Sequence, residues 1–422
     1  MRSESLETII IGAGPAGAVA AGLLRRAGRS VTVLEKAQFP RFVIGESLLP
    51  QSMAYLEAAG MLQDVIEAGF QFKNGAAFAC DQKRASFDFR RKFTPGWGTT
   101  CQVPRAPFDK LLADAAARQG ADIRYGHEVT ALSFSDGKPE LRVAAPEGEY
   151  RISGVFVLDA SGYGRVLPRL LGLEIPSALP ARQAIFTHIE DRIAEDPAAI
   201  AFDAFEREKI LISVHPQESD IWYWLIPFSN GRSSLGVVGR RAQFDQNPNE
   251  EDQAQLRRRV AEAPNLARLL RNAVWDTPVR RVTDYSANVK TLAGAGFALL
   301  GNAGEFLDPV FSSGVTIAFK SADLAVSTLL RQLAGEAVDW QRDYAAPLMQ
   351  GVETFRAFVN AWYDGKLQDI IFYPEKQPDV ECMISSVLAG YAWDTDNPFV
   401  ARPVRKLDAL AQAIRAETAS AE

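Results

Sequence analysis

A glycine pattern close to the start of the chain restricts the fold more than any other feature of the sequence. In ETIIIGAGPAGAVAAGLLRRAGRSVTVLEK, an apolar strand at Thr8–Ile11 precedes a G-x-G-x-x-G turn, and a helix and a second strand at Ser30–Leu34 follow. The first glycine, Gly12, permits a tight turn, and Gly14 lets the backbone approach a pyrophosphate. The third, Gly17, lets the helix pack closely on the strand, and free N–H groups at the helix start favour phosphates. The pattern predicts a Rossmann-like α/β domain that binds a dinucleotide.

An acidic residue supports the same interpretation. Glu35 ends the second strand about twenty residues after the turn, where a carboxylate can hydrogen-bond the ribose of an adenosine. The alternative is a glycine turn without a ligand, and the combination of strand, helix and acidic residue argues against it. Because the chain contains no second fingerprint of this kind, the pattern by itself leaves FAD and NAD open.

The composition excludes several other classes of protein. A chain of 422 residues is long enough for two or three domains. With 46 Lys and Arg against 52 Asp and Glu, the net charge is −6, so we expect no nucleic-acid partner. No Cys and His spacing typical of a zinc site occurs, and we expect no metal.

The cysteines and the N-terminal residues indicate a compartment. Cys80, Cys101 and Cys382 are scattered, which fits a reducing cytosol better than a disulfide framework. The first residues, MRSESLET, lack the basic and apolar regions of a signal peptide. The apolar run that follows is broken by glycines and a proline and is short for a membrane span. We therefore expect a cytoplasmic protein with no membrane span.

Three later segments favour FAD over NAD. They are the strand and small-residue turn at Val157–Gly164, the strand, turn and helix at Phe297–Leu330, and the helix-forming stretch at Gln102–Ala116. Together with the glycine turn they resemble the FAD domain of the hydroxybenzoate-hydroxylase-like flavoproteins. In that family a late Gly-Asp segment binds the ribityl and pyrophosphate part of FAD. Here it reads Gly301-Asn302, and an amide can still hydrogen-bond a hydroxyl.

The glycine motif and this resemblance together imply a set of FAD-binding residues. The set comprises Gly12, Ala13, Gly14, Pro15, Ala16, Gly17, Glu35, Lys36, Arg41, Ser47, Arg105, Val129, Asp159, Gly301, Asn302, Pro309, Gly314 and Val315.

A tryptophan pair narrows the family. The segment WYWLIP at Trp222–Pro227 matches W-x-W-x-I-P and resembles the signature of the flavin-dependent halogenases. In an extended strand Trp222 and Trp224 share a face. The resemblance places them in the substrate compartment, on its flavin side, where they keep a substrate from reaching the flavin directly. Two aromatic residues in an ordinary sheet core remain the alternative.

A second segment resembles the same family. FLDPVFSSG, Phe306–Gly314, matches F-x-x-P-x-x-S-x-G and predicts a loop that feeds a helix beginning near Ser313. Backbone N–H groups at a helix start can bind an anion. The resemblance implies that chloride or bromide binds at Ser313 and Gly314, beside the flavin. Stabilisation of a negatively charged reduced flavin by the same amides is the alternative.

The third segment contains a lysine. A G-E-S turn begins at Gly45, and GFQFKNGAAF follows at the spacing at which halogenases carry their catalytic lysine. The alternation predicts a strand with Phe72 on one face and Lys73 on the other. The resemblance implies that Lys73 is catalytic, at the end of a tunnel remote from the flavin, where it directs hypohalous acid. A solvated strand lysine is the alternative, since lysines are seldom buried.

One position departs from the tryptophan halogenases. They carry a glutamate before the serine of the second segment, where this chain has Phe311 in the substrate compartment. A phenylalanine cannot accept a proton. The residue resembles the branch that acts on electron-rich phenols and pyrroles, several of them presented on carrier proteins. His127, His188 and His215 lie outside these motifs and are expected to be structural.

These observations predict a Rossmann-like FAD-binding domain, an inserted and mostly antiparallel β-sheet substrate domain, and a C-terminal helical region. The expected ranges are 1–75, 98–180 and 285–345 for the FAD-binding domain, 76–97 and 181–284 for the substrate domain, and 346–422 for the helical region.

The resemblance implies an FAD-dependent halogenase of secondary metabolism. It would use FADH2 from a separate flavin reductase, O2, and chloride or bromide. Its substrate would be a phenol or pyrrole, either free or tethered to an acyl or peptidyl carrier protein. Two alternatives stay open: an FAD-dependent monooxygenase, dehydrogenase or reductase without halogenation, and a flavin-binding partner without enzymatic activity.

Overall fold

The first of two large sheets has a parallel centre. The computed structural model describes residues 3–135, 137–245 and 250–421. The strands of this sheet are β1 (Ser3–Ile11), β2 (Val31–Glu35), β7 (Asp122–Tyr125), β8 (Glu128–Ser135), β9 (Lys138–Ala145), β10 (Gly148–Asp159), β18 (Ala293–Gly294) and β19 (Phe297–Leu299). Their order is β18-β19-β10-β1-β2-β7, with β9 beside β10 and β8 beside β9. The run β19-β10-β1-β2-β7 is parallel throughout.

Helices cover this sheet and bury its apolar strands. The helices beside this sheet are α1 (Pro15–Arg26), α2 (Gln51–Ala58), α3 (Leu62–Glu67), α4 (Arg105–Arg118), α5 (Val166–Leu170) and α10 (Ser313–Leu333). All of β2 is buried, as expected for a parallel strand between covered faces. The helix predicted to begin near Ser313 does begin there.

The second sheet is mostly antiparallel. Its strands, in spatial order, are β16 (Arg280–Thr283), β12 (Arg182–Glu190), β15 (Arg232–Arg240), β14 (Trp222–Pro227), β13 (Lys209–Val214), β4 (Gly75–Cys80) and β5 (Lys83–Asp88). The neighbours β13 and β4 are parallel, and the other pairs are antiparallel. Beside it lie α6 (Pro197–Asp203), α7 (Arg241–Phe244), α8 (Asp252–Ala261) and α9 (Pro264–Leu269).

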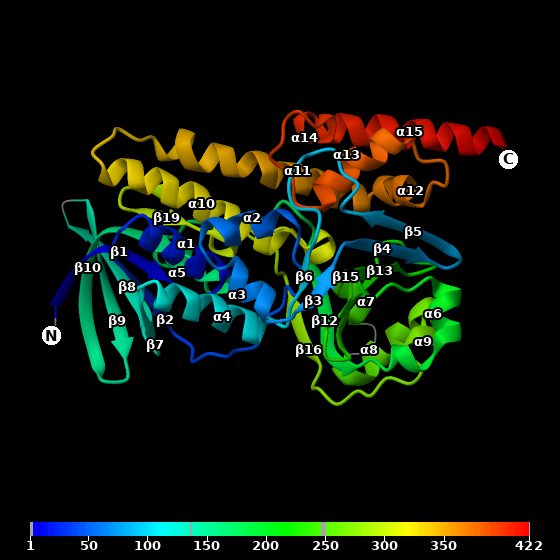
Figure 1. Cartoon of the computed structure of the whole chain (residues 1–422), viewed down its shortest axis with the longest axis horizontal. Helices are drawn as coiled ribbons and strands as arrows, with labels where there is room; N and C mark the ends of the chain where they lie inside the picture. Colours follow the sequence, from blue (N-terminus) through cyan, green and yellow to red (C-terminus); the bar gives the residue numbers. More distant parts are fainter. Residues whose placement is uncertain (1–2, 136, 246–249, 422) are drawn as a thin grey trace.

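The chain ends in a group of helices. They are α11 (Ala346–Tyr363), α12 (Lys366–Phe372), α13 (Pro378–Leu388), α14 (Pro398–Ala401) and α15 (Pro403–Ala421). Figure 1 shows them lying over the β4–β5 end of the second sheet, on the side away from α6, α8 and α9. The predicted fold class, including the C-terminal helical region, is therefore confirmed. The domain boundaries stay a prediction.

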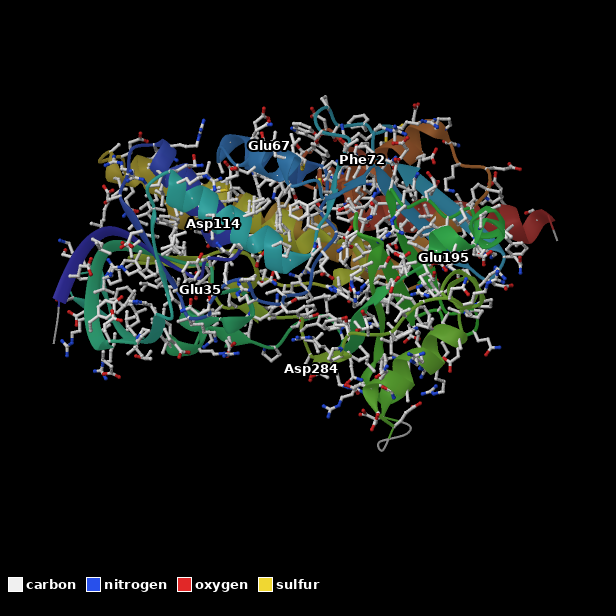
Figure 2. The ribbon with its side chains drawn as sticks, turned by 60° about the horizontal axis from the view of Figure 1, so that its bottom comes forward. Glu35, Glu67, Phe72, Asp114, Glu195 and Asp284 are labelled. Atoms are coloured by element: carbon white, nitrogen blue, oxygen red, sulfur yellow. The ribbon has the colours of Figure 1, made fainter. Side chains whose placement is uncertain are left out.

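Two short ribbons complete the strand pairing. One joins β11 (Glu174–Ile175) to β17 (Asn288–Val289), and the other joins β3 (Gln71–Lys73) to β6 (Thr100–Gln102). The second ribbon leads directly into β4. Figure 2 shows Phe72 between α2 and α3 on one side and the C-terminal helices on the other.

The exposure of β3 reverses the usual rule for a strand. Phe72 is 44% exposed, whereas its neighbour Lys73 is 0% exposed. The alternative of a solvated strand lysine is therefore wrong. The periodicity separated the two side chains correctly, but it could not tell which face the rest of the fold covers.

Candidate functional site

A cavity of about 810 Å³ lies where the glycine turn, the second sheet and the start of α10 meet. It is lined by many of the residues that the sequence predicted for the site: Gly12, Gly14, Pro15, Ala16, Glu35, Lys36, Arg41, Ser47, Arg105, Val129, Trp222, Trp224, Asn302, Pro309, Gly314 and Val315. The predicted residues outside this lining are Ala13, Gly17, Lys73, Asp159, Gly301, Phe311 and Ser313.

The glycine turn leaves room for a ligand. Gly12 has a φ of +97°, and a Cβ there would lie 2.6 Å from the carbonyl oxygen of Ala160, so this glycine is required by the protein's own packing. At Gly14 the nearest atom to an added Cβ is Arg41 Nη2 at 3.4 Å. The space above Gly14 is thus open toward the cavity, and the turn fits the pyrophosphate of FAD.

Glu35 supports the turn from below. Its Oε2 accepts a 2.9 Å hydrogen bond from the Ala13 N–H, and its Oε1 accepts one of 2.9 Å from the Ala37 N–H. Each carboxylate oxygen has a second lone pair, so Glu35 can still accept a hydrogen bond from a ribose hydroxyl. Ala13 therefore contributes through Glu35 and does not itself line the cavity.

Two predicted cofactor ligands have other partners. Both oxygens of the buried Asp159 carboxylate accept backbone hydrogen bonds, from Ser161 at 2.9 Å and Leu167 at 2.7 Å. Burial raises the pKa of Asp159. The Gly301 N–H donates to Ser321 Oγ at 2.9 Å. Both residues therefore shape the turns beside the cavity, and their role in binding the cofactor stays a prediction.

The tryptophan pair forms part of the cavity wall. Trp222 and Trp224 are buried, with ring centroids 5.9 Å apart. Trp222 Nε1 donates to the Tyr363 hydroxyl at 2.9 Å, and Trp224 Nε1 donates to Ser234 Oγ at 3.0 Å. Because both indole N–H groups are bonded, the two rings are held in fixed orientations.

Asp308 organises a cluster that the sequence did not predict. Its Oδ2 accepts hydrogen bonds from the hydroxyls of Tyr363, at 2.9 Å, and Tyr285, at 3.2 Å. The Arg182 guanidinium lies 3.3 Å from the centroid of the Tyr363 ring. Burial raises the pKa of the Asp308 carboxyl. Asp308 stands inside the FLDPVFSSG segment, but its tyrosine partners are remote in sequence and no motif signalled them.

The start of α10 faces the cavity. Ser312, which precedes the helix, has a φ of +56°, in the left-handed region that non-glycine residues rarely adopt. Ser312 and Gly314 line the cavity, whereas Ser313 is buried beside it. The first N–H groups of a helix have no intrahelical carbonyl partner. Donors and the positive end of a 21-residue helix therefore point toward this part of the cavity.

Phe311 lies in an aromatic cluster rather than in the cavity lining. Its ring packs edge-on against Trp362 and Phe358, at centroid distances of 5.9 and 6.4 Å. A carboxylate in its place would lie between these rings of α11, and burying an unpaired charge there is costly.

Lys73 is held by two uncharged acceptors. Its Nζ donates to Ser47 Oγ and to the Leu48 carbonyl oxygen, each at 2.7 Å, and lies 5.4 Å from the centroid of the Phe89 ring. In the part of the chain that the structure describes, no carboxylate forms an ion pair with it. Burial lowers the pKa of Lys73 to about 7. Ser47 also lines the cavity, so one side chain connects the cavity with Lys73.

Glu46, the neighbour of Ser47, was also missed by the sequence. It lines the cavity, and its Oε1 lies 2.7 Å from His188 Nε2. The histidines expected to be structural each contact another side chain: His127 lies 2.9 Å from the Tyr150 hydroxyl, and His215 lies 3.6 Å from Glu262. His127 lines the cavity as well.

Other expectations concern the whole chain. The three cysteines are unpaired. Within residues 3–135, 137–245 and 250–421, no group of three or more His, Cys, Asp or Glu side chains is arranged to hold a metal ion. None of the helices described is both long and apolar enough to cross a membrane.

Sequence comparison relates the chain to flavoproteins. The FAD binding domain family matches residues 5–346. The chain is 31% identical to a tryptophan 2-halogenase of Chondromyces crocatus, over 79% of this chain and 62% of that protein. It is 30% identical to the flavin-dependent halogenase gsfI of Penicillium aethiopicum, over 85% and 71%. It is 27% identical to a 1H-pyrrole-2-carbonyl-[peptidyl-carrier protein] chlorinase of Pseudomonas fluorescens, over 86% and 84%.

Structural comparison gives the same fold. A crystal structure described as a flavoprotein/dehydrogenase from Cytophaga hutchinsonii superposes with a TM-score of 0.93 and 42% identity, over 98% of this chain and all of that one.

Proposed function

The chain belongs to the FAD binding domain family and, within it, to the flavin-dependent halogenases, and from this membership we propose that it halogenates an electron-rich aromatic compound. The observation that carries the proposal is Lys73, a completely buried lysine without an ion pair among the described residues, hydrogen-bonded to a serine of the cofactor cavity. A structural lysine at such a depth is normally paired with a carboxylate.

FAD is the cofactor that this family binds. In its reduced form it would supply the reaction with O2 that oxidises a halide to hypohalous acid. The residues of this chain bind and shield it. Gly12 and Gly14 leave space for the pyrophosphate, and Glu35 is available for the ribose. We propose that a separate flavin reductase delivers the reduced cofactor, since the sequence has a single dinucleotide fingerprint.

Chloride or bromide would bind at the start of α10. The N–H groups of Ser313 and Gly314 belong to the first turn, where the helix dipole favours an anion. Gly314 and Ser312 line the cavity, which brings this turn within reach of the cofactor. The left-handed Ser312 fixes the direction in which the helix begins.

The tryptophan pair would separate the substrate from the cofactor. Trp222 and Trp224 present fixed rings to the cavity, since Tyr363 and Ser234 hold their indole N–H groups. An aromatic substrate on the far side of these rings could be reached only by a small, diffusing oxidant. Exclusion of water from the buried region around Lys73 would protect that oxidant.

Lys73 would direct the oxidant to the substrate. With its pKa lowered to about 7, roughly half of the amine is charged at neutral pH. The ammonium can donate a hydrogen bond to hypohalous acid, and the neutral amine can react with it to form a haloamine.

Phe311 bears on the substrate class. Its place between Trp362 and Phe358 means that this position offers no carboxylate to take a proton from the ring being halogenated. A phenol or pyrrole needs little such assistance because its ring is electron-rich. Similarity to the pyrrole-2-carbonyl carrier-protein chlorinase supports a carrier-tethered pyrrole as the substrate.

The unpaired cysteines fit a protein that works in a reducing cytoplasm.

Reconstitution tests the proposal. The FAD-loaded protein is supplied with a flavin reductase, NADH, O2, bromide or chloride, and a panel of free phenols, free pyrroles and carrier-bound pyrrole-2-carbonyl. Mass spectrometry should detect a halogenated product. Lys73→Met should lose it, whereas the control Lys209→Met, at another buried lysine, should retain it. Full halogenation by Lys73→Met would rule out the role of Lys73.

The similarity to the Cytophaga hutchinsonii flavoprotein/dehydrogenase favours a second candidate, a dehydrogenase, reductase or monooxygenase without halogenation. The same reconstitution distinguishes it. Flavin turnover that is stimulated by an organic substrate, is independent of halide and yields no halogenated product would support this second function.

A further inference from the structure

Ser47 stands between the cavity and Lys73. Among the described residues, Lys73 Nζ has two hydrogen-bond acceptors, Ser47 Oγ and the Leu48 carbonyl oxygen. Ser47 lines the cavity, whereas Leu48 does not. Since Ser47 Oγ accepts from the lysine, the hydrogen of its hydroxyl is free to be donated to a different atom.

The backbone fixes this contact. In β6, Thr100 pairs with Lys73 of β3, and Gln102 forms an antiparallel bridge with Ser47. The Leu48 N–H donates to the Cys101 carbonyl at 3.1 Å, and the Val103 N–H donates to the Glu46 carbonyl at 2.7 Å. The segments that carry Ser47 and Lys73 therefore flank the same short strand, and their side chains meet without depending on a flexible loop.

We propose that Ser47 is a positioning residue for Lys73: it holds the lysine Nζ directly behind the cavity wall and donates its own hydroxyl hydrogen to a halide in the cavity. The inference rests on the proposed function, since it takes the ligand of Ser47 from that chemistry. It goes further because it names the Ser47 hydroxyl as the group that contacts both the cavity and the lysine.

The surroundings of Lys73 make this contact measurable. The described groups facing its Nζ are Ser47, the Leu48 carbonyl and the Phe89 ring, and all are uncharged. The carboxylate of Glu46, which precedes Ser47 in the chain, has its Oε1 within 2.7 Å of His188 Nε2. A hydroxyl oxygen stabilises an ammonium more than a neutral amine. Removing it should lower the pKa of Lys73 further, by roughly one unit.

Competitive labelling of the FAD-loaded enzyme with isotopic acetic anhydride provides the test. The acetylation of Lys73 is measured at pH 6 and at pH 9 by peptide mass spectrometry, and the ratio of the two rates cancels differences in access. Ser47→Ala should raise this pH 6 to pH 9 ratio about fivefold, because more of the amine is neutral at pH 6. Ser47→Thr, which restores a hydroxyl, should bring it back toward wild type.

Ser213→Ala is the matched control. Ser213 is also buried, and its Oγ accepts a 2.7 Å hydrogen bond from Asn265 Nδ2 in the second sheet, away from the cavity lining. Its ratio should equal that of the wild type. An unchanged ratio in Ser47→Ala would overturn the proposal. If Ser47→Ala does not fold, Ser47→Cys takes its place, since sulfur is a weak acceptor of similar size.

Bromide tests the cavity side of the contact. An anion that accepts from the Ser47 hydroxyl makes its oxygen a better acceptor, so bromide should lower the wild-type ratio and leave that of Ser47→Ala unchanged. An equal effect of bromide on both proteins would overturn the donation into the cavity. Labelling needs no turnover. If the wild type yields no halogenated product but the acetylation ratios change as described, the proposed function is wrong and the contact between Ser47 and Lys73 is still supported.

Discussion

Two buried lysines flank Gly75 in the fold, and they differ in one respect. Lys73 ends β3 just before Gly75, and Lys209 pairs with Gly75 across β13 and β4. They are 0% and 5% exposed. Lys209 Nζ forms an ion pair with Glu206, whereas Lys73 has only uncharged partners among the described residues. Burial without a counter-charge, rather than burial itself, is therefore what sets apart the lysine that we propose to be catalytic.

The largest expected effect is on stability as a function of pH. The unfolded chain keeps the Lys73 proton up to the ordinary pKa of 10.5, and the folded chain releases it near 7. Between these values the unfolded state binds more protons, so the free energy of unfolding rises with pH. The difference between the two pKa values corresponds to roughly 5 kcal/mol.

Denaturant unfolding of the wild type and Lys73→Met from pH 6 to 10.5 measures this rise. Lys73→Met should be the more stable protein at pH 6, and its curve should lack the rise that the wild type owes to Lys73. Lys209→Met should keep the wild-type slope. Parallel curves for the wild type and Lys73→Met would mean that Lys73 has an ordinary pKa.

The next largest effect is on catalysis. A guanidinium keeps its proton at every pH that the protein survives, and it is larger than an ammonium. Lys73→Arg should therefore lower the halogenation rate by about 100-fold, in the range typical of a lost acid–base group. Lys209→Arg keeps the charge beside Glu206 and should stay within about twofold of wild type. Product formation is measured together with the melting temperature. Equal halogenation rates in Lys73→Arg and Lys209→Arg would show that Lys73 has no special role in catalysis.

A smaller effect should follow from the ring that faces Lys73. The Phe89 centroid lies 5.4 Å from its Nζ, and an aromatic face stabilises an ammonium. Phe89→Leu should lower the pKa of Lys73 by about half a unit. The limb of the pH–rate profile that Lys73 controls would then move to lower pH by that amount. A shift toward higher pH would contradict this role of the ring.

The smallest effect concerns the partner of Lys209. The Glu206 side chain is half exposed, so water screens its ion pair. Glu206→Gln should cost less than about 1 kcal/mol in the free energy of unfolding and leave halogenation unchanged. Denaturant unfolding at low and at high salt measures it. If Glu206→Gln lowers the free energy of unfolding several times more than this, the ion pair with Lys209 is not a weak, water-screened one, and the prediction is wrong.

The sequence was informative where a short segment determines its own geometry. The turn from Gly12 to Gly17, the shared face of Trp222 and Trp224, and the helix start at Ser313 depend on local spacing, and the structure has each of them. Exposure is different, because it depends on what packs against a segment. The alternation around Lys73 was correct, yet the lysine is buried and Phe72 is exposed.

None of the following side-chain contacts between distant segments was predicted from the sequence. His188 is 142 residues from Glu46, and Tyr363 is 55 residues from Asp308. No periodicity or motif encodes such a pair, since it exists only once two sheets and a helix have docked. Asp159 is a different case: the family resemblance predicted it as a cofactor ligand, and its oxygens accept backbone hydrogen bonds in the structure, so that role stays a prediction.

Tyr363 lies beyond residue 346, where the match to the FAD binding domain ends, yet its hydroxyl accepts from Trp222 and donates to Asp308. The orientation of Trp222, which lines the cavity, thus depends on a residue beyond the matched region. A chain trimmed after residue 346 would leave an indole N–H and a buried carboxylate oxygen each without this partner, next to the turn that starts α10. The C-terminal helices and the region matched by the FAD binding domain therefore depend on each other. A chimera that takes one of them from another protein would need a residue that replaces the hydroxyl of Tyr363.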